Sequence, residues 1–200
     1  MGKGMSEQIS EGGDDANTPL EDAERKQLIP SYITLRSELN QAELSNIVDA
    51  TSWLSKRKRD VLELSFLNEL HKRMFGDVWK WAGKYRTTPR NIGIEANLIP
   101  VELYQAVDDA KYWVEHKTYA PDEIAVRFSH RVVAIHPFPN GNGRFSRLIG
   151  DLLAIEQGRP RFTWGSINLV DPSNTRKQYI ATLKAADAGD IKPLVVFARS

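Results

Sequence analysis

The segment AIHPFPNGNGRFSR, residues 134–147, decides how this chain folds and where its chemistry lies. Pro137 and Pro139 cannot continue a helix, so a helix that precedes them should end close to His136. The two glycines that follow allow the backbone to curl before a second helix begins near Arg144. The segment is therefore predicted to be a tight connection between two helices.

The same connection has the composition of an anion-binding site. The N–H groups of a curled glycine-rich loop point into one concavity, and the N-terminus of the next helix favours negative charge. Arg144 and Arg147 are three residues apart, so their guanidinium groups lie on one side of the first turn and suit a polyphosphate. His136 has an ordinary pKa of about 6.5 and can accept a proton. The competing interpretation is a plain helix–helix loop whose arginines pair with carboxylates, such as Arg147 with Asp151.

Composition indicates one globular domain and excludes several kinds of site. Of the 200 residues 41% are hydrophobic, and 27 basic residues against 26 acidic ones leave a net charge of +1. This balance gives no general attraction to nucleic acids or membranes, and the basic run at 56–59 is interpreted as a solvated helix start. The absence of cysteine excludes disulfides, thiolate zinc sites and a cysteine nucleophile. Without a signal-peptide pattern or an apolar run of the ~20 residues that span a membrane, the protein is expected to be cytoplasmic.

Outside the connection, the chain is predicted to be all-α with one exception. Residues 1–27 are rich in small and acidic residues and are predicted to be a disordered leader before one domain at 28–200. Apolar residues recur every three or four positions in several segments, which predicts helices there. These helices begin near Ser37, Asp60, Pro100, Pro121, Arg144 and Pro172, and a short one follows Gly189. Between Lys84 and Pro100 the helical period fails, and a Pro-Arg-Asn turn signal predicts a small β-hairpin or an extended flap.

HPFPNGNGRFSR resembles the signature of Fic (Fido-superfamily) proteins, His-x-Phe-x-Asp/Glu-Gly-Asn-Gly-Arg-x-x-Arg. Seven of its eight specified positions match, namely His136, Phe138, Gly141, Asn142, Gly143, Arg144 and Arg147. FGDVWKWAGKYR, NIGIEANLIP and YIATLKAADAGDIKPL also resemble segments found in this order in these proteins, so the likeness covers roughly residues 30–198. The subgroup called mobile mystery protein B, with HPFPNGNGR and FTWG, is the most similar.

This resemblance implies a bacterial enzyme with a Fic-type helical domain that transfers AMP from ATP to a Ser, Thr or Tyr hydroxyl of a target protein. It implies that His136 is the general base and that the flap at Ile92 and Gly93 docks an extended target segment by strand pairing. Self-modification and a homo-oligomer are further expectations. Nucleotide binding is implied for Asn140, Gly141, Asn142, Gly143, Arg144 and Arg147, and enclosure of the adenosine for Tyr179 and Asp187.

Asn140 departs from the signature, which has Asp or Glu at this position to hold a Mg²⁺ that bridges the phosphates. An amide carbonyl is a neutral and weaker ligand for Mg²⁺, so Asn140 is a weak metal candidate. Three interpretations stay open. The enzyme transfers AMP with a higher Mg²⁺ requirement, it uses another phosphate-containing substrate, or it is a weakly active or non-catalytic relative that binds nucleotide and peptide.

Many Fic proteins also carry an inhibitory helix, Ser/Thr-x-x-x-Glu-Gly/Asn, whose glutamate pairs with the second arginine of the signature. Thr34-Leu-Arg-Ser-Glu38 fits the first part, but Leu39 replaces Gly or Asn. The resemblance therefore implies that Glu38, on a helix around 34–50, restrains Arg147. The alternative is that Thr34 and Glu38 cap an ordinary helix.

Overall fold

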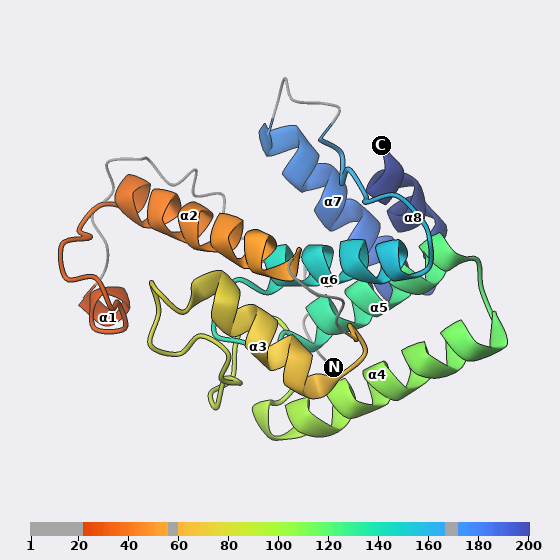
Figure 1. The fold of residues 1–200 in the computed structure, drawn as a ribbon, viewed down its shortest axis with the longest axis horizontal. Coiled ribbons are helices and arrows are strands. Elements are labelled where there is room, and N and C mark those ends of the chain that lie inside the picture. Colours follow the sequence, from red (N-terminus) through yellow and green to blue (C-terminus); the bar gives the residue numbers. More distant parts are fainter. Residues whose placement is uncertain (1–21, 56–59, 167–171) are drawn as a thin grey trace.

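The computed structural model describes residues 22–55, 60–166 and 172–200 of the chain. Within these ranges most of the backbone is helical, which confirms the predicted all-α class (Figure 1). The longer helices are α2 (Arg36–Leu54), α3 (Leu64–Phe75), α4 (Ile99–His116), α5 (Pro121–Ile135), α6 (Asn142–Glu156), α7 (Pro172–Asp187) and α8 (Lys192–Arg199), beside a single turn, α1 (Asp22–Arg25), and a 3-10 helix, η1 (Ala96–Leu98). None of these helices is long and apolar enough to cross a membrane.

The start of the domain lies slightly before the predicted boundary. Residues 1–21 of the predicted leader, and the basic run at 56–59, lie outside the described residues. The Gln27 carbonyl accepts a hydrogen bond from the N–H of Lys80 at 3.0 Å, and Leu28 is buried. The backbone of Gln27 is therefore bonded to the domain although its side chain is exposed, in a residue that the sequence assigned to the leader.

Helices α5 and α6 form the centre of the molecule, and the other helices surround this pair (Figure 1). α4 packs along α5, α2 packs on α3, and α8 contacts both α7 and α5. Four phenylalanines are among the largest fully buried side chains, and burying each one stabilises the fold by about 1.5–3 kcal/mol. They are Phe75, Phe128, Phe138 and Phe145. Since Phe138 belongs to the α5–α6 connection, this loop is anchored in the core.

The α5–α6 connection turns where the sequence predicts. α5 begins with Pro121 in its first turn and ends as His136 adopts a left-handed conformation with φ 54°. α6 begins at Asn142, two residues before the predicted start, because Gly141 supplies a φ of 80°. A Cβ at Gly141 would lie 2.6 Å from the ring of Phe75, so only glycine fits this position.

The β-hairpin predicted between Lys84 and Pro100 is wrong. No strand forms there, and the β-bridge recorded among the described residues joins Leu28 to Trp79 instead. The backbone N–H groups of Arg86 and Ile94 donate to carbonyls at the end of α5 rather than to each other's segment. The flap, residues 84–98, is therefore irregular up to η1 and is bonded to the end of α5 and the residues after it, which alternation of apolar residues could not reveal.

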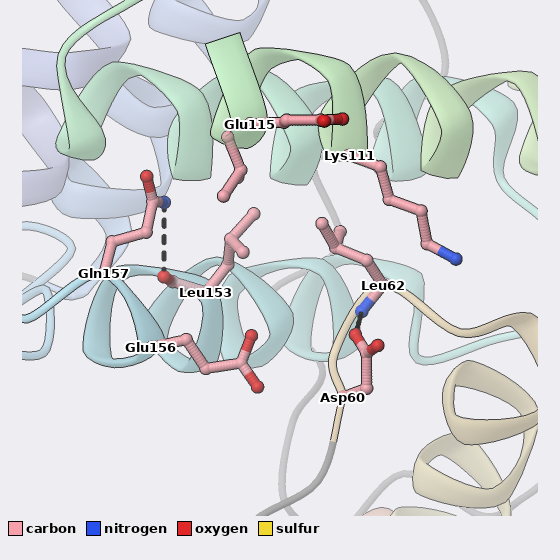
Figure 2. A pocket seen from close by; sticks show the side chains of 8 residues that line it. Asp60, Leu62, Lys111, Glu115, Leu153, Glu156 and Gln157 are labelled. Carbon is pink, nitrogen blue, oxygen red and sulfur yellow. Dashed lines mark hydrogen bonds between the residues drawn. The ribbon is translucent and has the colours of Figure 1, made fainter. Parts of the chain in front are cut away.

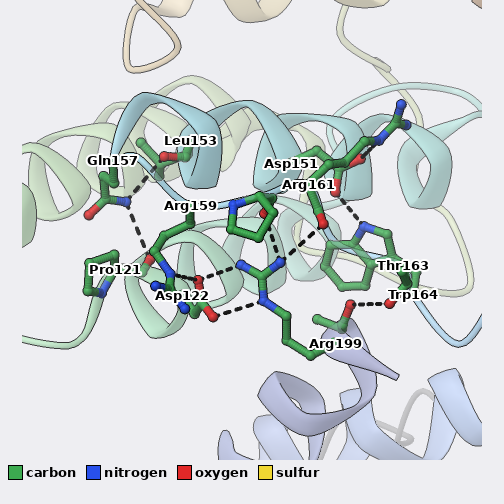
Figure 3. A network of polar contacts seen from close by, with 12 residues as sticks. Pro121, Asp122, Asp151, Leu153, Gln157, Arg159, Arg161, Thr163, Trp164 and Arg199 are labelled. Carbon is green, nitrogen blue, oxygen red and sulfur yellow. Dashed lines mark hydrogen bonds and ion pairs between the residues drawn. The ribbon is translucent and has the colours of Figure 1, made fainter.

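The C-terminal helix is fastened to the centre by a network of charged side chains (Figure 3). Asp122, in the first turn of α5, accepts hydrogen bonds from Arg199 of α8 and from Arg159. These bonds, that from Arg199 first, hold the pKa of Asp122 below its usual value. The buried Asp151 accepts the indole N–H of Trp164 at 2.8 Å. The network thus fixes both α8 and the segment that carries Trp164.

Candidate active site

A pocket of about 640 Å³ lies over the α5–α6 connection. One group of lining residues belongs to the α5–α6 connection and the start of α6, namely His136, Asn140, Gly141, Asn142, Gly143, Arg144 and Arg147. A second, largely apolar and aromatic group consists of Val133, Trp164, Tyr179, Ile180, Leu183 and Phe197, and Ile92 of the flap and Thr175 and Arg176 of α7 complete the lining. Most of the predicted site residues therefore meet in one cavity, but Gly93, Asp187 and Glu38 do not line it.

His136 is held at the C-terminal end of α5 with its side chain in the pocket. Its N–H donates to the carbonyl of Val132 at 3.2 Å, and its carbonyl accepts from the Arg86 guanidinium at 2.7 Å. Burial, and then the positive charge of Arg86, lower the pKa of His136 to about 4. The ring is therefore neutral at neutral pH and offers a lone pair to a nearby hydroxyl.

The first turn of α6 provides an anion-binding site. A helix leaves its first N–H groups without intrahelical acceptors, and here these belong to Asn142, Gly143 and Arg144. The side chain of Asn142 is not directed to a ligand. It is buried, and its Oδ1 accepts the backbone N–H of Phe138 at 2.9 Å, while its Nδ2 donates to the carbonyl of Phe138 at 2.8 Å. Asn142 thus shapes the loop with its side chain and can bind phosphate only through its backbone.

The two arginines of the loop are held in different ways. Arg144 pairs with Glu43 of α2, with 2.7 Å between guanidinium and carboxylate. Arg147 lies over the ring of Tyr179, with 5.1 Å between the guanidinium carbon and the ring centroid. Glu43 is 4% exposed and also accepts the indole N–H of Trp79 at 2.6 Å. An incoming phosphate therefore competes with a buried carboxylate for Arg144.

The structure contradicts the predicted contact between Glu38 and Arg147. Glu38 accepts the backbone N–H of Thr34 at 2.8 Å and that of Leu35 at 3.1 Å, so it caps α2. These bonds lower the pKa of the Glu38 carboxyl. The carboxylate of α2 that reaches the site is Glu43, which no motif in the sequence singled out.

Asn140 is exposed, and its side chain turns back onto its own loop. Its Oδ1 accepts the N–H of Gly141 at 2.7 Å. Within the described ranges no three His, Cys, Asp or Glu side chains are grouped so that they could hold a metal ion. Since Mg²⁺ prefers several hard, anionic oxygens, these residues do not fit an ion held by the protein itself.

Asp187, which was expected to enclose the adenosine, does not line the pocket. It lies at the end of α7, one turn beyond Leu183, where its carboxylate contacts Nε2 of His130 at 2.8 Å. Leu183 lines the pocket in its place. The structure therefore places Asp187 in the contact between α7 and α5.

His71 is a residue of the site that the sequence did not reveal. Its Nδ1 accepts the N–H of Gly83 at 3.0 Å, so Nε2 carries the proton and donates to the carbonyl of Asn140 at 3.2 Å. The ring stacks on Phe138 with 3.6 Å between centroids, and burial lowers its pKa to about 3. His71 therefore stabilises the α5–α6 connection as a neutral ring, through its contacts with Phe138 and Asn140. Its partners are 12 and 69 residues away, so no local spacing could reveal this role.

A larger cavity, of about 820 Å³, lies at the opposite end of α6 (Figure 2). It is lined by Asp60, Leu62, Lys111, Val114, Glu115, Leu153, Glu156 and Gln157. Asp60 accepts the N–H of Leu62, and Lys111 pairs with Glu63, so polar groups here already have partners within the fold. It combines no histidine with convergent donors, and we therefore place the active site at the N-terminal end of α6.

Comparison with known proteins shows which family has this architecture. A family model described as Fic/DOC family matches residues 61–154. Protein adenylyltransferase fic-1 of Caenorhabditis elegans is 30% identical over 146 residues, which cover 71% of this chain and 27% of that protein. That of Drosophila sechellia is 33% identical over 133 residues, 64% of this chain and 26% of that protein. The chain thus spans about a quarter of the length of these curated relatives.

Solved structures show the same fold. A fragment of Fic-1 from C. elegans aligns with a TM-score of 0.64 and 26% identity over 86% of this chain and 51% of that one. BepC from Bartonella tribocorum, solved with bound AMPPNP, aligns with a TM-score of 0.64 over 90% of this chain and 97% of that one. Its sequence is only 19% identical, so this second likeness concerns the fold alone.

Proposed function

Because this chain belongs to the Fic/DOC family, we propose that it is a protein adenylyltransferase that moves AMP from ATP to a Ser, Thr or Tyr hydroxyl of a target protein. One observation carries this proposal. A neutral histidine, His136, lies in the same pocket as a helix N-terminus and two arginines, Arg144 and Arg147. A base beside a polyphosphate site is the arrangement that nucleotidyl transfer to a hydroxyl needs.

The two groups of lining residues bind different parts of the nucleotide in this proposal. The phosphates bind the N–H groups of residues 142–144 with Arg144 and Arg147, where helix dipole and guanidinium groups favour negative charge. The adenine base binds among the aromatic side chains of Trp164, Tyr179 and Phe197. A volume of about 640 Å³ is in the range of pockets for ligands of this size.

The transfer step then follows from the positions of these groups. His136 takes the proton of the target hydroxyl as that oxygen attacks the α-phosphorus of ATP. The bond between the α-phosphorus and the oxygen bridging it to the β-phosphate breaks, and pyrophosphate leaves. The α6 N–H groups and Arg144 stabilise the charge that develops on the transferred and leaving groups. The proton stays on His136 until solvent or product removes it.

The flap is the proposed docking site for the target. Ile92 lines the pocket, Gly93 is exposed, and neither belongs to a strand. We propose that an extended segment of the target pairs with this backbone, a recognised mode of peptide binding, and brings its hydroxyl next to His136. The partner would order an irregular segment rather than extend a preformed hairpin.

Several expectations accompany this proposal as predictions. Mg²⁺ enters as a partner of the phosphates of ATP, because the protein offers only the neutral Asn140 at this place. The cytoplasmic location, the bacterial origin, the mobile mystery protein B subgroup, self-modification and a homo-oligomer also stay predictions. The curated relatives reported above are from a nematode and a fly.

A second function, nucleotide binding without efficient transfer, is favoured by two contacts. Glu43 pairs with Arg144, and the Asn140 side chain accepts the N–H of Gly141. Both contacts use groups that a transferring enzyme would direct to phosphate. In this second function the pocket holds a nucleotide and the flap holds a peptide, but no bond is made.

Labelled ATP distinguishes these functions. The protein and a cell lysate are incubated with ATP labelled at the α- or the γ-phosphate, across a series of Mg²⁺ concentrations. α-Label on protein, lost in His136→Ala while ATP still binds, is the expected result. γ-Label would indicate phosphate transfer, and no label at high Mg²⁺ would indicate binding alone. Including Asn140→Asp tests the metal, since a carboxylate there should lower the Mg²⁺ concentration needed for half the maximal rate.

A further inference from the structure

Arg86 is a buried cation whose hydrogen bonds all go to backbone carbonyls around the site. Arg86 is only 3% exposed, and within the described part of the chain its guanidinium bonds to backbone carbonyls and to no carboxylate. The guanidinium donates to the carbonyl of His136 at 2.7 Å and to that of Ile135 at 3.3 Å. It also donates to the carbonyls of Thr88, at 3.2 Å, and Ile94 in the flap.

Two backbone hydrogen bonds join the same segments. The N–H of Arg86 donates to the carbonyl of Pro137 at 2.9 Å, and that of Ile94 donates to the carbonyl of Ile135 at 3.4 Å. The flap is thus bonded at two points, Arg86 and Ile94, to Ile135 at the end of α5 and to Pro137 just after it. Only the guanidinium, with five donors in a planar fork, can join carbonyls of both segments at one point.

The flap and the histidine are also in steric contact at Gly93. Gly93 has a φ of 94°, and a Cβ there would lie 2.5 Å from the Cβ of His136 and 2.9 Å from the guanidinium of Arg86. A side chain would therefore force the flap away from His136. Because Gly93 has no Cβ, the flap can lie directly against His136. The hydrogen bonds of Arg86 then fix the distance between the flap backbone and His136.

We propose that Arg86 is a positioning residue that locks the target-docking flap onto His136, so that docking a target segment also sets its hydroxyl against the base. This inference rests on the proposed function, in which the flap docks the target and His136 is the base. Arg86 does not line the pocket, so it acts on the target and the base rather than on the nucleotide.

Arg86→Lys is the first test, with Arg73→Lys as its matched control. Lysine keeps the positive charge but loses the fork, so it cannot reach both segments. Because misplacement of reacting groups by about 1 Å can cost on the order of 100-fold in rate, we expect kcat to fall ~10- to 100-fold. The KM for the target should rise, while the Kd of ATP changes less than about twofold. Arg73, half exposed and paired with Glu69 on α3, should tolerate lysine without change.

Gly93→Ala tests the same contact from the flap and does not alter a buried charge. This variant should also lower kcat and raise the KM for the target, while the Kd of ATP stays unchanged. If Arg86→Lys does not fold, Gly93→Ala alone decides, since Gly93 is exposed. Rates are expressed per ATP-binding molecule, so that a loss of folded protein alone leaves both kcat and KM unchanged.

Amide hydrogen exchange supplies a readout that does not depend on transfer. In Arg86→Lys, exchange should become faster in peptides covering 87–98 and 133–143 and stay unchanged in α3. Unchanged exchange in these peptides, faster exchange throughout the protein, or a kcat/KM within twofold of the wild type would each overturn the proposal. If the wild type transfers no AMP, the proposed function fails, and the exchange result still decides whether Arg86 joins the two segments.

Discussion

Two histidines of the site are both buried, and their surroundings give them different roles. His136 lines the pocket and His71 lies beneath the loop, and burial is the first cause of the lowered pKa of both. Both ring nitrogens of His71 have hydrogen-bond partners, so this ring has a structural role. His136 faces the cavity and can exchange a proton. The sequence predicted His136 from its motif but could not reveal His71, whose role depends on distant backbone groups.

The lowered pKa of His136 predicts the pH dependence of transfer. A general base works in its neutral form, and here that form persists until the pH falls to about 4. The value of kcat/KM, which reports the free enzyme, should therefore be flat between pH 8 and about 5.5 and fall only below that range. Transfer rates at low target concentration measure this. Half the maximal kcat/KM near pH 6.5 would show that His136 is not buried in the working enzyme.

The pKa of His71 predicts how stability depends on pH. Folded His71 has a pKa of about 3, whereas an unfolded histidine has about 6.5, so protons bind the unfolded chain preferentially between these values. Stability should fall as the pH drops, by about 1.4 kcal/mol per unit from His71 alone. Urea denaturation at pH 7.5 and 5 should show a smaller pH effect in His71→Gln. An equal effect in both proteins would contradict the burial of the neutral ring.

At the scale of elements, the regular helices were predictable and the contacts between them were not. Prolines, glycines and apolar spacing placed the ends of α5 and α6 to within two residues, because these signals act on the local backbone. The sequence suggested a hairpin in the flap, but the guanidinium of Arg86, itself a flap residue, binds the carbonyls of Thr88 and Ile94 together with those of Ile135 and His136. Similarly, Glu38 caps α2 as its local spacing allows. Glu43, five residues further along, reaches Arg144 only because α2 packs on α3, which in turn contacts α6.

The contact between α2 and Arg144 predicts that Glu43 weakens nucleotide binding. In Glu43→Gln the negative charge is lost, but an acceptor for the Trp79 indole is kept. The Kd of ATP should fall by up to about tenfold, which corresponds to ~1.4 kcal/mol. Equilibrium binding of ATP measures this. Glu38→Gln is the matched control on the same helix, and it should leave the Kd unchanged. A tighter Kd in Glu38→Gln instead would restore the inhibitory role that the sequence suggested.

At the scale of the whole molecule, the last helix depends on a few charged contacts. Arg199 of α8 bonds to Asp122 at the start of α5 and to the carbonyl of Pro160. The backbone N–H groups of Thr163 and Trp164 also donate to the carbonyl of Ala198. The pocket wall formed by Trp164 and Phe197 is therefore held in place by residues that do not line the pocket, namely Asp122, Ala198 and Arg199. No motif predicts such a network, since its members are far apart in the sequence.

This network predicts a coupled loss of stability and of binding. Asp122→Asn removes the charge that holds Arg199, so the free energy of unfolding should fall by about 1–3 kcal/mol. The Kd of ATP should rise, because the aromatic wall loosens. Urea denaturation and ATP binding measure the two effects. Asp109→Asn is the control, as Asp109 forms an exposed pair with Arg131 and such pairs contribute about 0–1 kcal/mol. An equal fall in the free energy of unfolding in both variants would show that the Asp122 network stabilises the fold no more than an ordinary ion pair does.

The stacking of His71 on Phe138 has a spectroscopic consequence. Protons close to the face of an aromatic ring are shielded, and the two ring centroids lie 3.6 Å apart. The carbon-bound ring protons of His71 should therefore resonate upfield of those of a histidine surrounded by water. They should also keep their chemical shift as the pH changes from 8 to 5, because the ring does not titrate there. A one-dimensional proton spectrum would thus report directly whether the α5–α6 connection is formed.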